Sequence, residues 1–173
     1  MRRQGRYLRE YGFTLVELMV TVSIAGILLG FGVPAMQEIF MTQRVKTAAS
    51  DAHLSLLLAR SEAIKRNQNI VIDTASNWEN GWNVKVQADS TVLRTQDPFS
   101  GVKIECNTDA DDAAETCPST VTFTRTGRTS SFVEFRLFID GNNKVFARCV
   151  TISLSGVPRV EVDNDRNAAN GCS

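Results

Sequence analysis

One stretch of the sequence, residues 18–37, constrains the fold more than any other. It holds 20 consecutive residues without a charged side chain. As an α-helix these residues would extend for about 30 Å, which is the thickness of the hydrocarbon core of a bilayer. Four arginines and one glutamate lie among residues 1–12, and positive charge before an apolar helix keeps the N-terminus in the cytoplasm. We therefore expect one membrane-spanning helix, with the rest of the chain on the far side of the membrane.

Glu17 stands at the edge of this apolar stretch, where a plain membrane anchor would have no need of it. A carboxylate costs about 2.5–3.5 kcal/mol at the centre of a bilayer and less near an interface. We interpret Glu17 as one half of a salt bridge that forms when subunits assemble. A cleaved secretory signal explains the stretch poorly, because such signals have an apolar run of about 7–15 residues and a small-residue cleavage site. A plain anchor stays open as the alternative.

Beyond Pro34 the pattern changes to an amphipathic helix that continues to about Asn67. Apolar residues recur there at spacings of three and four, from Val45 to Ala63, which is typical of a helix packed on one face. His53 lies on this helix, and we expect it to be a surface or hydrogen-bonded residue without a functional role.

After residue 67 the sequence consists of short β-type runs separated by turn signals. Asn80-Gly81 and the sequence from Asp140 to Asn142 predict hairpin turns, and we expect Trp78 and Trp82 to be core residues beside the first turn. The fold class is therefore α+β, a long N-terminal helix packed on antiparallel sheets. The expected strands are residues 70–72, 82–86, 91–94, 102–106, 120–124, 131–139, 144–154 and 159–162.

Four cysteines lie in the C-terminal half of the chain: Cys106, Cys117, Cys149 and Cys172. An even number in an exported chain predicts two disulfides, and four cysteines allow three connectivities. We favour Cys106–Cys117, which closes a short acidic loop, and Cys149–Cys172, which holds the C-terminus.

We expect no metal site and no cofactor. There is no C-x-x-C pair, and a single histidine cannot complete a zinc site of cysteines and histidines. The loop between Cys106 and Cys117 carries Asp109, Asp111, Asp112 and Glu115. It lacks the glycine of an EF-hand, so we expect this loop to meet a partner or solvent rather than calcium.

The run from Gly12 to Leu18, Gly-Phe-Thr-Leu-Val-Glu-Leu, resembles the class III signal of type IV pilins and type II secretion pseudopilins. The resemblance implies that a prepilin peptidase cuts between Gly12 and Phe13 and methylates the new terminus. It also implies that Glu17 pairs with the terminal amine of a neighbouring subunit, and that Pro34 is the helix-bending proline of the family. Residues 1–12 would then be the leader, 13–39 the transmembrane and assembly helix, and 40–173 the periplasmic head, with an amphipathic helix at 40–67 and a β-rich part at 68–173.

Several stretches of the head resemble a narrower group, the minor pilins and pseudopilins called GspH, FimU and FimT. They are residues 59–63 (Ala-Arg-Ser-Glu-Ala), the Trp-x-x-Gly-Trp run at 78–82, residues 91–94, 123–127 and 148–149, and the late strand pair at 152–160. The resemblance implies a structural subunit at the tip of a pilus assembled from the inner membrane. Its partners would be the prepilin peptidase, other minor pilins and the major pilin. A GspH pseudopilin of type II protein secretion is the alternative.

Residues 120–160 hold six basic side chains and only two acidic ones. The six are Arg125, Arg128, Arg136, Lys144, Arg148 and Arg159. Such a segment could contact phosphates, and FimT-type pilins, which this segment resembles, bind DNA through a Gly-Arg-x-Arg motif. Here Val157 replaces the first arginine of that motif and Pro158 removes a backbone donor. A DNA-binding pilin for natural transformation, with contacts from Arg125, Arg128 and Arg159, is therefore an alternative that we disfavour.

Charge and motifs also narrow the function classes. Residues 13–173 carry 15 basic and 18 acidic side chains, a balance that does not suit a general polyanion binder. The sequence contains no G-x-S-x-G, no phosphate-binding loop and no histidine placed beside a nucleophile. We expect a structural subunit and not an enzyme.

Overall fold

The computed structural model describes residues 12–108 and 117–164, with the backbone alone for residues 31–35. The chain divides into two compact units, residues 1–37 and residues 38–173. Helix α1 (Leu15–Arg66) belongs to both units, and its residues from Glu38 onwards form the beginning of the second. Pro34 falls inside α1, and the bend expected at this proline stays a prediction.

α1 ends one residue before the predicted position, and Asn67 explains why. Asn67 has a φ of 53°, a left-handed conformation that asparagine tolerates better than most residues. Its N–H donates to the carbonyl of Ile64 at 3.3 Å, and the N–H of Gln68 donates to the carbonyl of Ala63 at 3.2 Å. These two bonds form a Schellman motif, which satisfies carbonyls that the last turn of a helix otherwise leaves without a donor.

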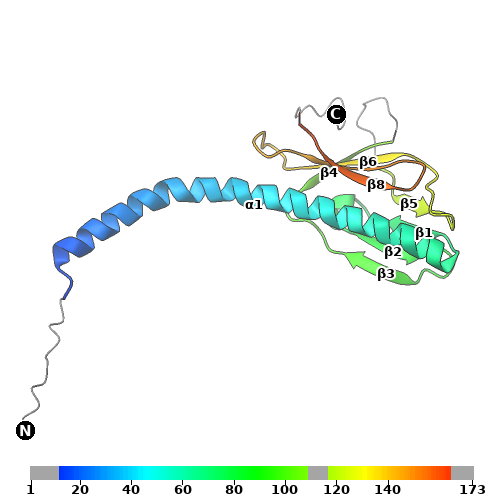
Figure 1. The fold of residues 1–173 in the computed structure, drawn as a ribbon, viewed down its shortest axis with the longest axis horizontal. Coiled ribbons are helices and arrows are strands. Elements are labelled where there is room, and N and C mark those ends of the chain that lie inside the picture. The colour runs from blue at the N-terminus through cyan, green and yellow to red at the C-terminus, as the bar shows by residue number, and fades with distance from the viewer. Residues whose placement is uncertain (1–11, 109–116, 165–173) are drawn as a thin grey trace, which may run out of the picture. The chain divides into compact units, whose positions relative to one another are not determined.

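The second unit contains two antiparallel four-stranded sheets. Figure 1 shows their strands beside the C-terminal part of α1. The first has the order β3-β2-β1-β5 and consists of β1 (Ile70–Asp73), β2 (Trp82–Val86), β3 (Val92–Gln96) and β5 (Thr120–Phe123). The second has the order β4-β6-β7-β8 and consists of β4 (Lys103–Asn107), β6 (Val133–Phe138), β7 (Arg148–Ile152) and β8 (Pro158–Val162). The α+β class and the antiparallel pairing are therefore confirmed.

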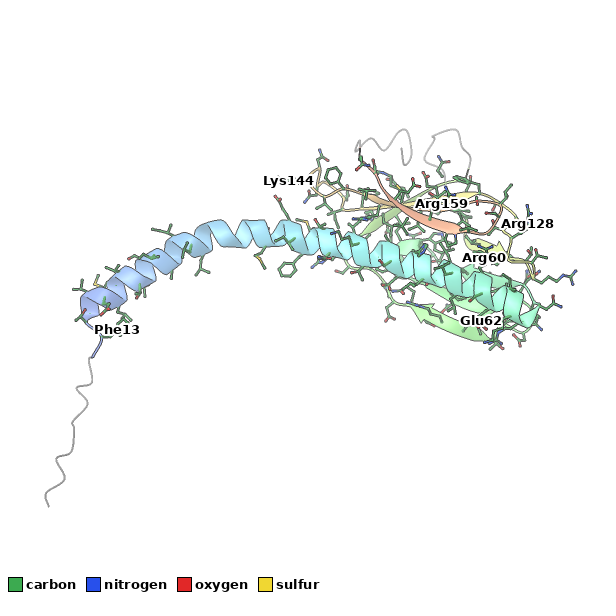
Figure 2. All side chains as sticks on the ribbon, in the orientation of Figure 1. Phe13, Arg60, Glu62, Arg128, Lys144 and Arg159 are labelled. Carbon is green, nitrogen blue, oxygen red and sulfur yellow. A yellow bond between two sulfur atoms is a disulfide. The ribbon has the colours of Figure 1, made fainter. Side chains whose placement is uncertain are left out.

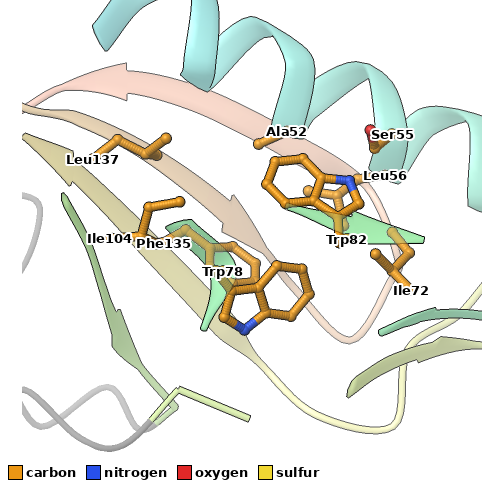
Figure 3. A pocket seen from close by; sticks show the side chains of 9 residues that line it. All are labelled: Ala52, Ser55, Leu56, Ile72, Trp78, Trp82, Ile104, Phe135 and Leu137. Carbon is orange, nitrogen blue, oxygen red and sulfur yellow. The ribbon is translucent and has the colours of Figure 1, made fainter. Parts of the chain in front are cut away.

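The core lies between these sheets and α1. Buried residues alternate along β2 and β6, so that one face of each strand points into the core. α1 contributes mainly alanines, including Ala48, Ala59 and Ala63, each no more than 1% exposed. Small side chains let the helix backbone lie close to both sheets. A cavity of about 10 Å³ lies in this region, and Figure 3 shows side chains that line it, among them Trp78, Trp82 and Phe135.

The hairpin predicted at Asn80-Gly81 is present, since β1 and β2 pair antiparallel, but its connection is not a tight two-residue turn. Residues Trp78–Asn80 form a short 3₁₀ helix, η1, and Gly81 leads from it into β2. Trp78 is drawn into the core as expected, where its Nε1 donates to the carbonyl of Pro118 at 2.8 Å and its ring meets Phe135 edge-on at 4.7 Å. Because the chain bends inward to bury this ring, the connection between the paired strands β1 and β2 takes residues 74–81 and is longer than a two-residue turn.

The turn predicted from Asp140 to Asn142 is also shorter than the connection in the structure. The chain between β6 and β7 takes nine residues, 139–147, and β7 is shorter than the expected strand at 144–154. The Asn142 Oδ1 accepts the N–H groups of Lys144, at 2.8 Å, and Val145, at 3.3 Å. These bonds offer the backbone an alternative to a sheet ladder, and Val145 is buried as a result of the loop path.

Candidate functional site

The bond between Gly12 and Phe13, predicted to be cut, lies just outside the capped start of α1. The Thr14 Oγ1 accepts the N–H of Glu17 at 3.2 Å, and the Thr14 carbonyl accepts the N–H of Leu18 at 3.1 Å. Thr14 is thus the N-cap of α1. Phe13 is 74% exposed, and no heavy atom lies within 4 Å of the place where a Cβ on Gly12 would stand. A protease can therefore reach this bond without unwinding the helix.

Glu17 occupies the third position of α1 and is exposed. A threonine cap followed three residues later by glutamate is the pattern of a capping box, and a carboxylate is favoured near the positive end of the helix dipole. The sequence reasoning missed this local contribution. Within the described part of the chain Glu17 forms no ion pair, so its pairing with a neighbouring amine stays a prediction.

Apolar side chains cover the first unit without burial. Leu15, Val20, Ile24 and Leu28 are each more than half exposed, as are most of the large apolar residues between Phe13 and Leu29. No helix in the described residues is both long enough and apolar enough to cross a membrane. The span expected over residues 13–39 stays a prediction.

One of the two predicted disulfides is present in full. Cys106 on β4 is bonded to Cys117, which joins β4 to the segment that enters β5. Cys149 on β7 is also disulfide-bonded, while Cys172, its predicted partner, lies outside the described residues, as do the four acidic residues of the loop at 109–115. Over the described ranges no group of three metal-ligating side chains comes together.

Two of the six basic residues of the predicted patch are neutralised by acids from elsewhere in the chain. Arg136 donates to Asp163 at 2.9 Å and lies 3.5 Å from Glu105. Lys144 pairs with Glu38 on α1, and this hydrogen bond raises the pKa of the lysine. All three acids, Glu38, Glu105 and Asp163, lie outside residues 120–160. A count of charges along that segment could therefore not find them.

Arg125 and Arg128 lie together on an exposed turn after β5. The Gly127 N–H donates to the Thr124 carbonyl at 2.7 Å, and the Thr124 N–H donates to the Arg128 carbonyl at 2.8 Å. This turn packs against the β7–β8 turn, because a Cβ on Gly156 would lie 1.9 Å from the Gly127 carbonyl oxygen. Arg159 is exposed on β8, opposite Thr151. Figure 2 shows Arg128 and Arg159 toward the end of the second unit where α1 finishes.

A polar groove of about 760 Å³ lies beside the Arg125–Arg128 turn. Its other walls are residues 67–69, which follow α1, and residues 87–88, which follow β2. Arg159 does not line it, so the structure separates this arginine from the other two candidates. The sequence reasoning missed the groove. The run Asn67-Gln68-Asn69 was the available signal, since three amides in a row give a surface rich in hydrogen-bonding groups.

His53 does not fit the expectation of a satisfied side chain. It is half-buried on α1, and its Nδ1 has no hydrogen-bond partner among the described residues. Nothing in the described structure gives this nitrogen a chemical role.

Comparison with known families finds two matching models. The model of type II transport protein GspH matches residues 48–156, and the prokaryotic N-terminal methylation motif matches residues 8–33. Together they cover the processing signal, the apolar helix start and most of the second unit. A comparison with curated proteins finds no significant match.

Two solved structures share the fold. The type IV minor pilin FimU of Pseudomonas aeruginosa is 22% identical over 76% of this chain and 96% of its own, with a TM-score of 0.58. The minor pseudopilin EpsH from the type 2 secretion system of Vibrio cholerae is 17% identical over 70% of this chain and 98% of its own, with a TM-score of 0.53. One of these two proteins is a minor pilin and the other a minor pseudopilin.

Proposed function

Because this chain belongs to the family of type II transport protein GspH, we propose that it is a minor pilin, incorporated at the tip of a type IV pilus. In this proposal a prepilin peptidase removes residues 1–12 and methylates Phe13. The mature subunit waits in the inner membrane, with residues 13–39 in the bilayer and the head in the periplasm. It then enters a filament with other minor pilins and the major pilin.

The exposed apolar surface at the start of α1 carries this proposal. Phe13, Leu15 and Leu28 are 74%, 73% and 67% exposed in the single chain. Each Å² of apolar surface taken out of water contributes about 25 cal/mol, so a helix covered with such side chains gains greatly from lipid or from neighbouring helices. In a pilus subunit these side chains are buried first by membrane lipid and later by neighbouring helices in the filament.

The position of Glu17 supports the assembly step. Thr14 fixes the helix start at Leu15, which places the new amine of Phe13 two residues before the first helical residue. A methylated amine is positively charged, and a carboxylate in a low-dielectric setting attracts it strongly. Pairing between Glu17 of an incoming subunit and the terminus of its neighbour would offset the cost of placing both charges among apolar helices.

Service in a type II secretion pseudopilus is the alternative assignment, since the family model bears that system's name. The two are separated by deleting the gene and measuring both outputs in the same strain. We expect the number of surface pili to fall, with the secretion of type II substrates unchanged. If secretion were lost and pilus number stayed normal, the chain would instead be assigned to the type II secretion pseudopilus.

DNA binding is the weaker candidate function, favoured only by the exposed pair Arg125 and Arg128. Arg136 and Lys144 are engaged in ion pairs, and Val157 stands where the first arginine of the FimT-type motif would be. A titration of the purified chain with duplex DNA at two salt concentrations tests it. We expect weak binding, with a dissociation constant in the non-specific range near 10⁻⁴ M or above.

A further inference from the structure

The groove beside the Arg125–Arg128 turn has a composition that differs from the rest of the second unit. Its lining contains two arginines, four side-chain amides and three threonines, and it contains no carboxylate. The chain as a whole balances its charges, and residues 13–173 have an excess of acids. A local concavity with two guanidinium groups and many hydrogen-bonding groups is therefore a candidate for binding.

Hydrogen bonds through Asn69 hold the walls of the groove together in the isolated chain. The Asn69 Oδ1 accepts the N–H of Arg125 at 3.2 Å, which joins the wall after α1 to the arginine turn. The Asn69 Nδ2 donates to the Gln87 Oε1 at 3.0 Å, which joins it to the wall after β2. The three walls are thus linked before any ligand arrives, which lowers the conformational cost of binding.

The side chains on these walls suit a peptide that carries carboxylates. Arginine binds a carboxylate through two parallel N–H groups, and Arg125 and Arg128 stand three residues apart on one turn. Amides such as those of Gln68 and Gln87 can donate to backbone carbonyls and accept from backbone N–H groups. An extended acidic segment offers both kinds of partner, whereas a phosphate backbone offers acceptors alone.

The electrostatics of the groove also favour a peptide over a nucleic acid. Asp89 directly follows Ala88 of the lining, and a hydrogen bond from the backbone N–H of Thr91 lowers the pKa of its carboxyl. The negative end of the α1 dipole lies at the wall formed by Asn67. Both features repel any anionic ligand, so a ligand with a charge at every phosphate is opposed more than a peptide whose few carboxylates lie at the arginines.

We propose that the groove between Asn69, Gln87 and the Arg125–Arg128 turn binds an acidic peptide segment of a neighbouring pilin-type subunit. The partner rests on the proposed function, because only an assembled subunit has such a neighbour. The head then contributes a specific contact in addition to the apolar helix. Arg125 and Arg128 recognise carboxylates, and Asn69 holds the turn that presents them.

The test uses the purified full chain in detergent and a fluorescein-labelled peptide of about eight residues, with three aspartates spaced by glycine and serine. We expect saturable binding by fluorescence anisotropy, and at least about a tenfold loss of affinity for the Arg125→Gln, Arg128→Gln double variant. Arg159→Gln removes one exposed arginine outside the groove, and it serves as the matched control with unchanged affinity. Equal thermal unfolding of the three proteins confirms that both variants fold.

Two outcomes would overturn the proposal. One is peptide binding that is absent, or that is equal in the double variant and in the unaltered chain. The other is duplex DNA of matched charge that binds more tightly than the peptide and loses affinity on the same double substitution, which would make the groove a nucleic-acid site. Because binding is measured on the isolated chain, this result is independent of assembly, and a failure of the proposed pilus function would show instead as normal pilus number after gene deletion.

Discussion

Gly156 and Gly127 approach so closely that a Cβ on Gly156 would lie 1.9 Å from the Gly127 carbonyl oxygen. This contact joins the turn after β5, in the first sheet, to the β7–β8 turn, in the second. The Thr129 Oγ1 donates to the carbonyl of Ser153 at 3.0 Å and strengthens the same junction. The Arg125–Arg128 turn is therefore positioned by a glycine in the turn between β7 and β8 of the other sheet.

We expect Gly156→Ala to destabilise the chain by about 2 kcal/mol or more, because the methyl group meets the Gly127 backbone and the φ of 73° is strained for alanine. Urea unfolding of the purified chain measures the loss. Gly141→Ala is the matched control, since Gly141 has a similar φ of 68° but no atom within 4 Å of the new methyl. Its loss should be about 1 kcal/mol, and equal losses for both variants would show that the close approach has no energetic weight.

The ion pair between Arg136 and Asp163 gives a second prediction. Asp163 is fully buried, and Arg136 donates to it at 2.9 Å. Arg136→Met leaves this carboxylate without its guanidinium, and removal of one partner from a buried pair costs about 3–5 kcal/mol. Arg159→Met, at an exposed position on β8, should change the free energy of unfolding by less than about 0.5 kcal/mol. If the two substitutions prove equally mild in urea, Arg136 does not anchor the end of β8.

The disulfides give a third prediction. Peptide mapping without reduction should recover Cys106 linked to Cys117, as in the structure, and Cys149 linked to Cys172. Replacing Cys106 and Cys117 together by serine removes a cross-link over a separation of 11 residues, which should cost about 3 kcal/mol in the chain-entropy model. A peptide that joined Cys106 to Cys149 would show this pairing to be wrong.

Much of the fold follows from residue pattern. The amphipathic spacing from Val45 to Ala63 identified the buried face of α1, and short β-type runs between turn signals identified strands such as Trp82–Val86 and Val133–Phe138. The hairpin at Asn80-Gly81 was predicted too short, because the burial of Trp78 draws residues 78–80 into a 3₁₀ helix between β1 and β2. Tertiary contacts decide such cases, and a single sequence does not contain them.

The candidate sites show the same limit. The processing signal at Gly12 and Phe13 is local in sequence, so the sequence alone identified it. The six basic residues predicted as one patch do not act as one, because Arg136 and Lys144 form ion pairs with Asp163 and Glu38 in the folded chain. These partners are distant in sequence. The groove was missed because Asn69, Gln87 and Arg125 are brought together by strand pairing and not by proximity in sequence.

For assembly, we expect Glu17→Ala to be cleaved and held in the membrane normally but incorporated poorly into filaments. The substitution makes an apolar environment easier to enter and removes the carboxylate that attracts the neighbouring amine. Immunoblots of membrane and sheared-pilus fractions give the incorporated share. Glu161→Ala, an exposed acid on β8, is the control, and normal incorporation of Glu17→Ala would refute this role.

The most direct test of the central claim is mass spectrometry of the N-terminus of this chain in purified, sheared filaments. The account predicts a mature subunit that begins with N-methylated Phe13, found in the filament fraction of a strain with active prepilin peptidase and absent when the peptidase gene is deleted. A chain that keeps Met1 in the peptidase-positive strain and never enters the filament fraction would contradict it.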